Sequence, residues 1–197
     1  MILGISGRIG SGKDTVASWL VRERGFVIVR FSDALKEEVL AKFRGTLAAL
    51  WRLHYHTEPK GRDLSDMVHQ IKPEGVRELL QEFGTDVRRD DDPSYWVRRW
   101  AERIAPHVGA FRHTSVVAPD VRFPNEAQII RKLGGRVWRI TRSGPKASGH
   151  ISESMLDGFD GSWNETLDNN GTIHDLEQTL ARLVPQEQHH ADPAPPR

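Results

Sequence analysis

The sequence predicts an α/β fold of three layers, in which helices flank both faces of a mostly parallel sheet. Three observations favour this class: short apolar runs alternate with helical patterns, a glycine-rich turn follows the first run, and the hydrophobic content of 38% is enough for a core. The 197 residues suit a single domain. With 28 Lys and Arg against 27 Asp and Glu, the chain has no general attraction to nucleic acid or anionic lipid.

The expected strands are short apolar runs, most of them rich in β-branched or aromatic residues and bounded by turn residues. They cover residues 1–6, 26–31, 115–118, 136–141 and 166–169. Because helical patterns separate most of them, we expect parallel pairing. Parallel sheets bind ligands at the carboxyl ends of their strands, so the turn after residue 6 and Asp120 should lie at one edge.

The expected helices carry apolar side chains at i, i+3, i+4 and i+7. They cover residues 15–20, 76–83, 97–108, 124–133 and 173–183. A further helix should begin at a cap from Ser32 or Asp33. Gly84 should stop the helix expected over 76–83. Residues 44–72 lose this periodicity, and we interpret them as a helical insertion or a mobile lobe.

The glycine-rich turn fits the pattern G-x-x-x-x-G-K from Gly7 to Lys13. In such a P-loop, backbone N–H groups cradle phosphate oxygens and the lysine neutralises the β- and γ-phosphates. The turn follows an expected strand and opens an expected helix, which is the context that the motif requires. We therefore expect ATP to bind here. The expected contacts are Arg8, Gly10, Ser11, Gly12, Lys13, Asp14 and Thr15.

Asp14 takes the position at which a P-loop usually carries Ser or Thr. A carboxylate there could hold Mg²⁺ directly or through water, and it could equally be an acid in the first turn of a helix. Thr15 would then be the hydroxyl nearest the phosphates.

Later motifs extend this pattern into a family resemblance. The ending G-K-D-T resembles the P-loop of the deoxynucleoside monophosphate kinases of bacteriophages and, more distantly, that of phosphomevalonate kinase. Over about residues 1–184, order and spacing are similar to the first family in Arg77-x-x-x-Gln81-x-x-Gly84-Thr85-Asp86, Tyr95-Trp96-Val97, Pro119-Asp120-x-Arg122-x-x-x-Glu126, Arg142, Lys146, His150-Ile151-x-Glu153 and Asn169-x-Gly171. The resemblance implies a P-loop NTPase fold, ATP with Mg²⁺, a deoxynucleoside monophosphate (dNMP) as acceptor, and a homodimer.

The chemistry of that reaction needs cations rather than a protein base. By analogy with phosphoserine, whose second pKa is about 6, the acceptor phosphate is mostly dianionic at pH 7 and is its own nucleophile. Catalysis must then come from positioning and from cations that follow the transferred charge. The expected catalytic residues are Lys13, Asp120, Arg122 and Arg142. Asp120 suits a Walker-B-like acid beside Mg²⁺, and a purely structural pairing with Arg122 is the alternative.

The expected acceptor contacts include two residues on one helical face. Arg77 and Gln81 lie one turn apart and could offer a charge and an amide to a nucleotide, unless Arg77 pairs with Glu74 or Glu78 instead. The expected dNMP-binding residues are Asp33, Lys36, Arg77, Gln81, Thr85, Asp86, Arg122 and Glu153. For Asp33 and Lys36, a capping acid and a solvated lysine are the alternative.

The domain boundaries follow from these assignments. We expect one kinase domain over residues 1–185, with a helical substrate-binding region at about 44–108 and a lid at about 142–161 that closes over ATP. Lys146, Asn169 and Gly171 are expected to contact ATP, against the alternatives of a solvated basic loop and an ordinary turn. The tail over 186–197 should be disordered.

Composition excludes several other classes. The absence of Cys rules out disulfides, cysteine-ligated metal centres and a thiol nucleophile. We expect small-molecule substrates, no nucleic acid polymer, no membrane, and a cytoplasmic location, which would be the host-cell cytoplasm if a phage encodes the chain. The open alternatives are a kinase of another phosphorylated acceptor, such as dephospho-coenzyme A or phosphomevalonate, a nucleotide-switch ATPase, and a degenerate nucleotide-binding module.

Overall fold

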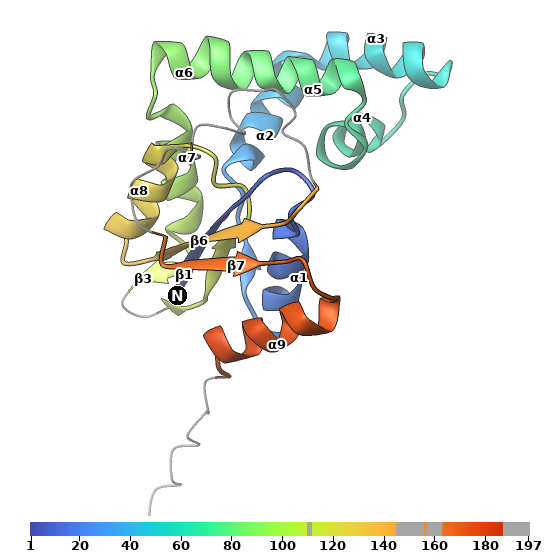
Figure 1. The fold of residues 1–197 in the computed structure, drawn as a ribbon. Helices are drawn as coiled ribbons and strands as arrows, with labels where there is room; N and C mark the ends of the chain where they lie inside the picture. Colours follow the sequence, from blue (N-terminus) through green and yellow to red (C-terminus); the bar gives the residue numbers. More distant parts are fainter. Residues whose placement is uncertain (110–111, 145–155, 157–162, 187–197) are drawn as a thin grey trace, which may run out of the picture.

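The computed structural model describes residues 1–109, 112–144, 156 and 163–186 (Figure 1). Within these residues five strands form one sheet in the order β2-β5-β1-β6-β7, and every neighbouring pair is parallel. The strands are β1 (Ile2–Ser6), β2 (Val27–Ile28), β5 (Val116–Ala118), β6 (Arg136–Thr141) and β7 (Glu165–Asp168). The predicted α/β class with a parallel sheet is therefore confirmed, and the chain has a P-loop fold.

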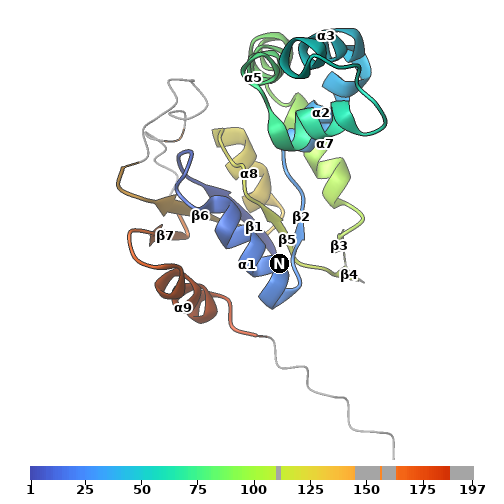
Figure 2. The same ribbon diagram turned by 90° about the vertical axis from the view of Figure 1, so that its right-hand side faces the viewer.

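Helices surround the sheet and build a separate lobe above it (Figures 1 and 2). The helices are α1 (Lys13–Arg24), α2 (Ser32–Lys42), α3 (Arg44–Tyr55), α4 (Asp63–Asp66), α5 (Glu74–Gln81), α6 (Arg88–Asp91), α7 (Tyr95–Ile104), α8 (Pro124–Lys132) and α9 (Ile173–Leu183). Two π-helical segments, η1 (Met67–Ile71) and η2 (Glu82–Val87), and a small antiparallel pair, β3 (Val108–Gly109) with β4 (Arg112–His113), complete the described elements.

Two apolar cores lie on opposite faces of the sheet. On one face, Leu3 and Ile5 of β1 pack with α1 and α9. On the other face, Ile2 packs with Trp100 of α7 and Ile130 of α8. Because β1 is covered on both faces, all five of its residues are buried, and each fully buried Leu or Ile contributes about 1.5–3 kcal/mol. This burial fixes the end of β1, where the P-loop begins.

The helical lobe has a third core of its own. It includes Leu47 of α3, Met67 of η1, Val76 of α5 and Trp96 of α7, all at most 3% exposed. Residues 44–72, which have no clear period, thus fold into α3, α4 and η1 because they bury side chains against neighbouring helices.

The expectation that Gly84 stops a helix is wrong. The helical backbone runs on from α5 through η2 into α6. Gly84 instead lies in a close contact between helices: a Cβ there would lie 2.7 Å from Cδ2 of Leu35 in α2, so the Leu35 side chain would have to shift. Its carbonyl also accepts a hydrogen bond from Nε1 of Trp96 at 2.8 Å. The environment of Gly84 is therefore a tertiary contact, which the sequence periodicity does not reveal.

Two other boundaries also differ from the sequence expectation. The helix predicted over 97–108 ends at Ile104, and Val108 begins β3. The cap expected from Ser32 or Asp33 comes instead from Asp120, whose carboxylate accepts the N–H groups of Phe31 and Ser32 at 3.0 Å each. The last helix does begin at a capping box, in which Thr172 and Asp175 exchange hydrogen bonds as predicted.

Within the described residues, no helix is both long enough and apolar enough to cross a bilayer. The expected ligands Lys146 and Glu153, most of the expected lid and nearly all of the expected tail lie outside the described residues.

Candidate active site

The carboxyl ends of β1, β2 and β5 lie below the helical lobe. The P-loop follows β1, Arg30 follows β2 and Asp120 follows β5, so all three lie at the sheet end that faces the lobe (Figure 1). This is the edge at which an open parallel sheet binds ligands, as the sequence predicts.

The P-loop holds Lys13 over its own backbone. Its Nζ donates hydrogen bonds to the carbonyl oxygens of Gly7 at 2.6 Å and Arg8 at 2.7 Å. The ammonium group therefore lies within the turn whose N–H groups would cradle phosphate. Lys13 also opens α1, so the partial positive charge of the helix N-terminus acts at the same place.

Asn169, which follows β7, holds this loop in place through hydrogen bonds, and we call it the brace of the loop. Its Nδ2 donates to the carbonyl of Ser11 at 2.8 Å, and its backbone N–H donates to Thr141 at 2.8 Å. Gly12 makes the approach possible, because its φ of +104° favours glycine and a Cβ there would collide with the Asn169 amide. Asn169 is only 9% exposed, and its hydrogen bonds to Ser11 and Thr141 hold the P-loop in position. Gly171 lies at the turn before α9, where a Cβ would come within 2.8 Å of Asp175 Oδ2.

Substituting Asn169→Ala should raise the KM for ATP about tenfold and destabilise the fold by about 1–3 kcal/mol, because the buried Ser11 carbonyl loses its donor. Steady-state kinetics and thermal unfolding measure the two effects. Asn170→Ala is the matched control, since Asn170 is exposed and its side chain contacts Ser143 and Asp168. An Asn169→Ala enzyme with an unchanged KM for ATP would contradict the brace.

Beside the carboxyl ends of β2 and β5, a cavity of about 230 Å³ is lined by residues of the sheet edge and of the lobe. It brings together six of the predicted site residues: Lys36, Arg77, Gln81, Thr85, Asp120 and Arg122. The sequence analysis did not assign its other charged lining residues, which are Lys72, Arg89 and Glu126. Five cationic side chains thus face two carboxylates, which makes the cavity suitable for an anion. The side chain of Asp86 is outside the described part of the structure.

The predicted cations are held in defined positions. Lys36 is only 7% exposed and lies 3.6 Å from Asp33, so the alternative of a solvated lysine is wrong. Asp33 also accepts the N–H of Arg30 at 3.0 Å. Arg77 makes no ion pair with Glu74 or Glu78 in the part of the chain that the structure describes, and it lines the cavity instead.

Glu126 is the buried anchor of the cavity wall. One carboxylate oxygen accepts from Arg89, and the other accepts the backbone N–H groups of Arg122 at 2.8 Å and Phe123 at 3.1 Å. The Arg89 guanidinium also stacks 3.6 Å above the Phe123 ring. Burial raises the pKa of Glu126, while Arg89 and the Arg122 N–H act in the opposite direction. Glu126 thus fixes two arginines at once. The sequence signal for Glu126 is its place in the motif Pro119-Asp120-x-Arg122-x-x-x-Glu126.

Two predicted metal-binding acids have protein partners. Asp14 lies 3.1 Å from Arg30, and its side chain is 81% exposed. Asp120 accepts the two N–H groups that begin α2. No group of three or more potential metal ligands occurs among the described residues. Proteins usually hold Mg²⁺ through one or two carboxylates together with substrate phosphates. Arg142 follows β6 and is exposed.

A phosphate-binding loop and a cationic cavity at one end of a parallel sheet are the arrangement expected of a P-loop nucleotide kinase. Residues 52–180 match the family model of deoxynucleotide monophosphate kinase. A protein of Acanthamoeba polyphaga mimivirus, provisionally described as a deoxynucleotide monophosphate kinase, is 31% identical over 202 residues, which cover 93% of this chain and 96% of that protein. The chain therefore belongs to the deoxynucleotide monophosphate kinase family, and the resemblance seen in its motifs is confirmed.

Other similar proteins are more distant or uncharacterised. The uncharacterised protein ORF77 of Ictalurid herpesvirus 1 (strain Auburn) is 30% identical over 187 residues, covering 93% of this chain and 70% of that protein. TT1252 from Thermus thermophilus has a TM-score of 0.46 at 19% identity, with 93% and 95% of the two chains covered. Dephospho-CoA kinase from Campylobacter jejuni has a TM-score of 0.43 at 14% identity, with 92% and 94% covered. Structural likeness at this level carries no argument about substrate.

Proposed function

We propose that this protein transfers the γ-phosphoryl group of ATP to a deoxynucleoside monophosphate and releases ADP and the deoxynucleoside diphosphate. The observation that carries the proposal is the cationic cavity at the same end of the sheet as the P-loop, since two polyanions must approach each other for transfer. Membership of the deoxynucleotide monophosphate kinase family supports the choice of acceptor.

The residues divide between donor and acceptor. The P-loop and Lys13 bind the ATP phosphates, with Asn169 as the brace behind the loop. Lys36, Arg77, Gln81 and Thr85 bind the acceptor nucleotide from the lobe side. Neither group includes a general base, because the dianionic acceptor phosphate attacks without losing a proton. Roles for Arg142, Lys146, Asp86 and Glu153 rest on the family resemblance alone.

Mg²⁺ fits the carboxylates at this edge. Asp120 would hold the ion beside the phosphates, and Asp14 would do so from the first turn of α1. The ion would neutralise charge on the β- and γ-phosphates. Asp120 also orders the start of α2 through Phe31 and Ser32, so it fixes the wall of the cavity as well.

Arg122 is proposed to bind the group being transferred. Its backbone N–H is fixed by Glu126 at the cavity wall, and a guanidinium fork matches phosphate oxygens. Arg122→Ala should lower kcat about 10²-fold or more, at least as strongly as it weakens acceptor binding, because the charge on that group grows toward the transition state. Initial rates at varied dNMP separate the two effects. A change confined to KM would make Arg122 a uniform binder instead.

A panel of acceptors tests the proposed substrate class. The protein is incubated with ATP and Mg²⁺ and with each of the four dNMPs, dephospho-coenzyme A, phosphomevalonate or no acceptor, and ADP release is followed. We expect the highest kcat/KM with one or more dNMPs. A higher kcat/KM with either of the other acceptors would overturn the assignment of the substrate. The homodimer implied by the family resemblance stays a prediction.

A further inference from the structure

Lys72 sits on a strained piece of backbone beside the cavity. It ends the π-helical segment η1 with φ of +48° and ψ of +66°, a left-handed conformation that side chains other than glycine rarely adopt. The conformation is held by a hydrogen bond from its N–H to the Met67 carbonyl at 2.8 Å. Strained residues and π-helical turns both occur preferentially at functional sites, so this position calls for a reason.

The side chain of Lys72 lines the cavity next to other cations. Lys36 and Arg77 line it as well, and Lys72 itself is half-buried. Lys36 has Asp33 within 4.0 Å, and Arg89 has Glu126. Among the described side chains, no carboxylate lies within that distance of the Lys72 ammonium. Burial lowers the pKa of Lys72, as do Lys36, Arg77 and Arg30, while Asp14 acts in the opposite direction.

The lining of the cavity supplies that reason. Lys72 and Arg77 reach the cavity from the lobe, and Lys36 reaches it from α2. Because five cations and two carboxylates line the cavity, a dianionic phosphate bound there would offset the excess positive charge.

We propose that Lys72 binds the phosphate of the acceptor nucleotide, as a third cation in the cavity together with Lys36 and Arg77. The inference rests on the proposed function, because it assigns the cavity to the acceptor. The alternative is a purely structural role, in which Lys72 only terminates η1. Glycine would serve that purpose better, since it adopts the left-handed conformation without strain.

The glycine substitution separates these two accounts. Lys72→Gly removes the ammonium group and relieves the backbone, so the thermal midpoint should stay unchanged or rise. The KM for dNMP should rise about tenfold or more through loss of a charge-assisted bond, with the KM for ATP changed less than about twofold. Lys72→Arg, which keeps the charge, should stay within about fivefold of the unaltered enzyme.

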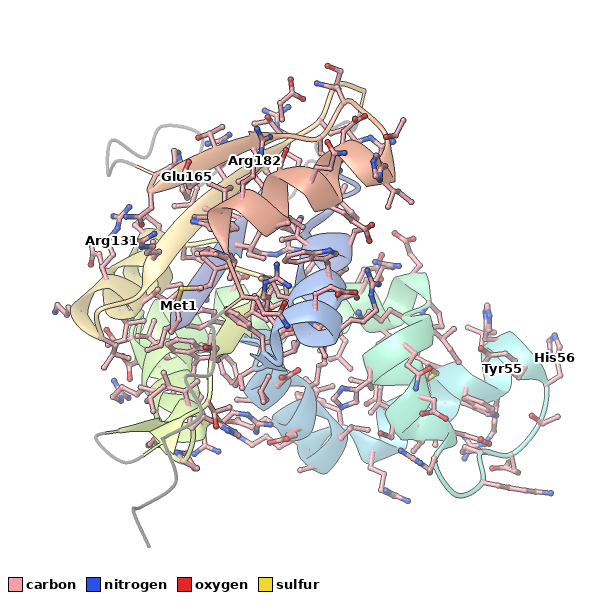
Figure 3. The ribbon with its side chains drawn as sticks, turned by 90° about the horizontal axis from the view of Figure 1, so that it is seen from below. Met1, Tyr55, His56, Arg131, Glu165 and Arg182 are labelled. Atoms are coloured by element: carbon pink, nitrogen blue, oxygen red, sulfur yellow. The ribbon has the colours of Figure 1, made fainter. Side chains whose placement is uncertain are left out.

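His56 provides the matched control. It also has a positive φ, +56°, but it lies at the outer end of the lobe, away from the sheet (Figure 3). His56→Gly should relieve the backbone in the same way and leave both KM values unchanged. If Lys72→Gly keeps the KM of the unaltered enzyme for dNMP, the inference is overturned.

Calorimetric titration with a dNMP alone tests the inference separately from catalysis. Binding that weakens about tenfold in Lys72→Gly supports the contact, and equal affinity refutes it. Absence of dNMP-dependent ADP in the unaltered protein would instead refute the proposed function. At alkaline pH, dNMP binding should also take up protons, because a bound dianion raises the lowered pKa of Lys72. Titrations in two buffers of different ionisation enthalpy measure this uptake, which Lys72→Arg should abolish.

Discussion

Lys13→Met should lower kcat about 10³-fold while the protein stays folded. The ammonium group contacts the Gly7 and Arg8 carbonyls within the P-loop, where the β- and γ-phosphates of ATP would lie. Its charge is needed most in the transition state, because negative charge then moves onto the leaving oxygen of ADP. The loss should therefore appear in kcat as well as in the KM for ATP.

Initial rates at saturating dNMP and varied ATP measure the effect, and circular dichroism checks the fold. Lys132→Met is the control. It changes the side chain in the same way, but at an exposed residue in the last turn of α8. We expect the control to retain full activity. A Lys13→Met enzyme within about tenfold of normal turnover would remove Lys13 from the catalytic set.

Glu126→Gln should lower the free energy of unfolding by about 3–5 kcal/mol, because it leaves the Arg89 guanidinium buried without its counter-charge. The side chains of Arg89 and Glu126 are only 13% and 2% exposed, so water cannot replace the lost carboxylate. The same substitution should reduce kcat/KM, since the single amide oxygen of glutamine can accept from the backbone N–H of Arg122 or from the side chain of Arg89 but cannot anchor both.

Urea unfolding followed by circular dichroism measures the change in stability. Glu102→Gln is the control, since Glu102 is 63% exposed, pairs with Arg99 on the surface, and should matter by about 1 kcal/mol or less. The double variant Glu126→Gln with Arg89→Met should recover part of the lost stability by removing the unpaired charge. Equal stability of the Glu126→Gln and Glu102→Gln proteins would contradict the role of Glu126 as a buried anchor.

Local signals explain which parts could be predicted from the sequence. The strand expected over 136–141 matches β6, and the capping box at Thr172 lies where expected, because both depend on neighbouring residues. The P-loop could be recognised for the same reason, since its glycines and Lys13 are contiguous. Arg77 and Gln81 also reach one cavity from one helical face.

Tertiary contacts explain the rest. Gly84 interrupts no helix, and its closest packing partner, Leu35, comes from another helix. Lys72 follows a segment without periodicity, so nothing in the pattern directs it into the cavity. Asp120 caps a helix that begins 88 residues earlier in the chain. Such contacts between distant segments leave no periodic pattern.

The central claim is that the P-loop and the cationic cavity serve one transfer reaction. It is tested most directly by counting ADP and deoxynucleoside diphosphate in the same mixture of protein, ATP and Mg²⁺, with and without a dNMP. We predict one diphosphate for every ADP, and no ADP above background when the dNMP is left out. ADP that forms equally well without an acceptor would show hydrolysis in place of transfer and would contradict the claim.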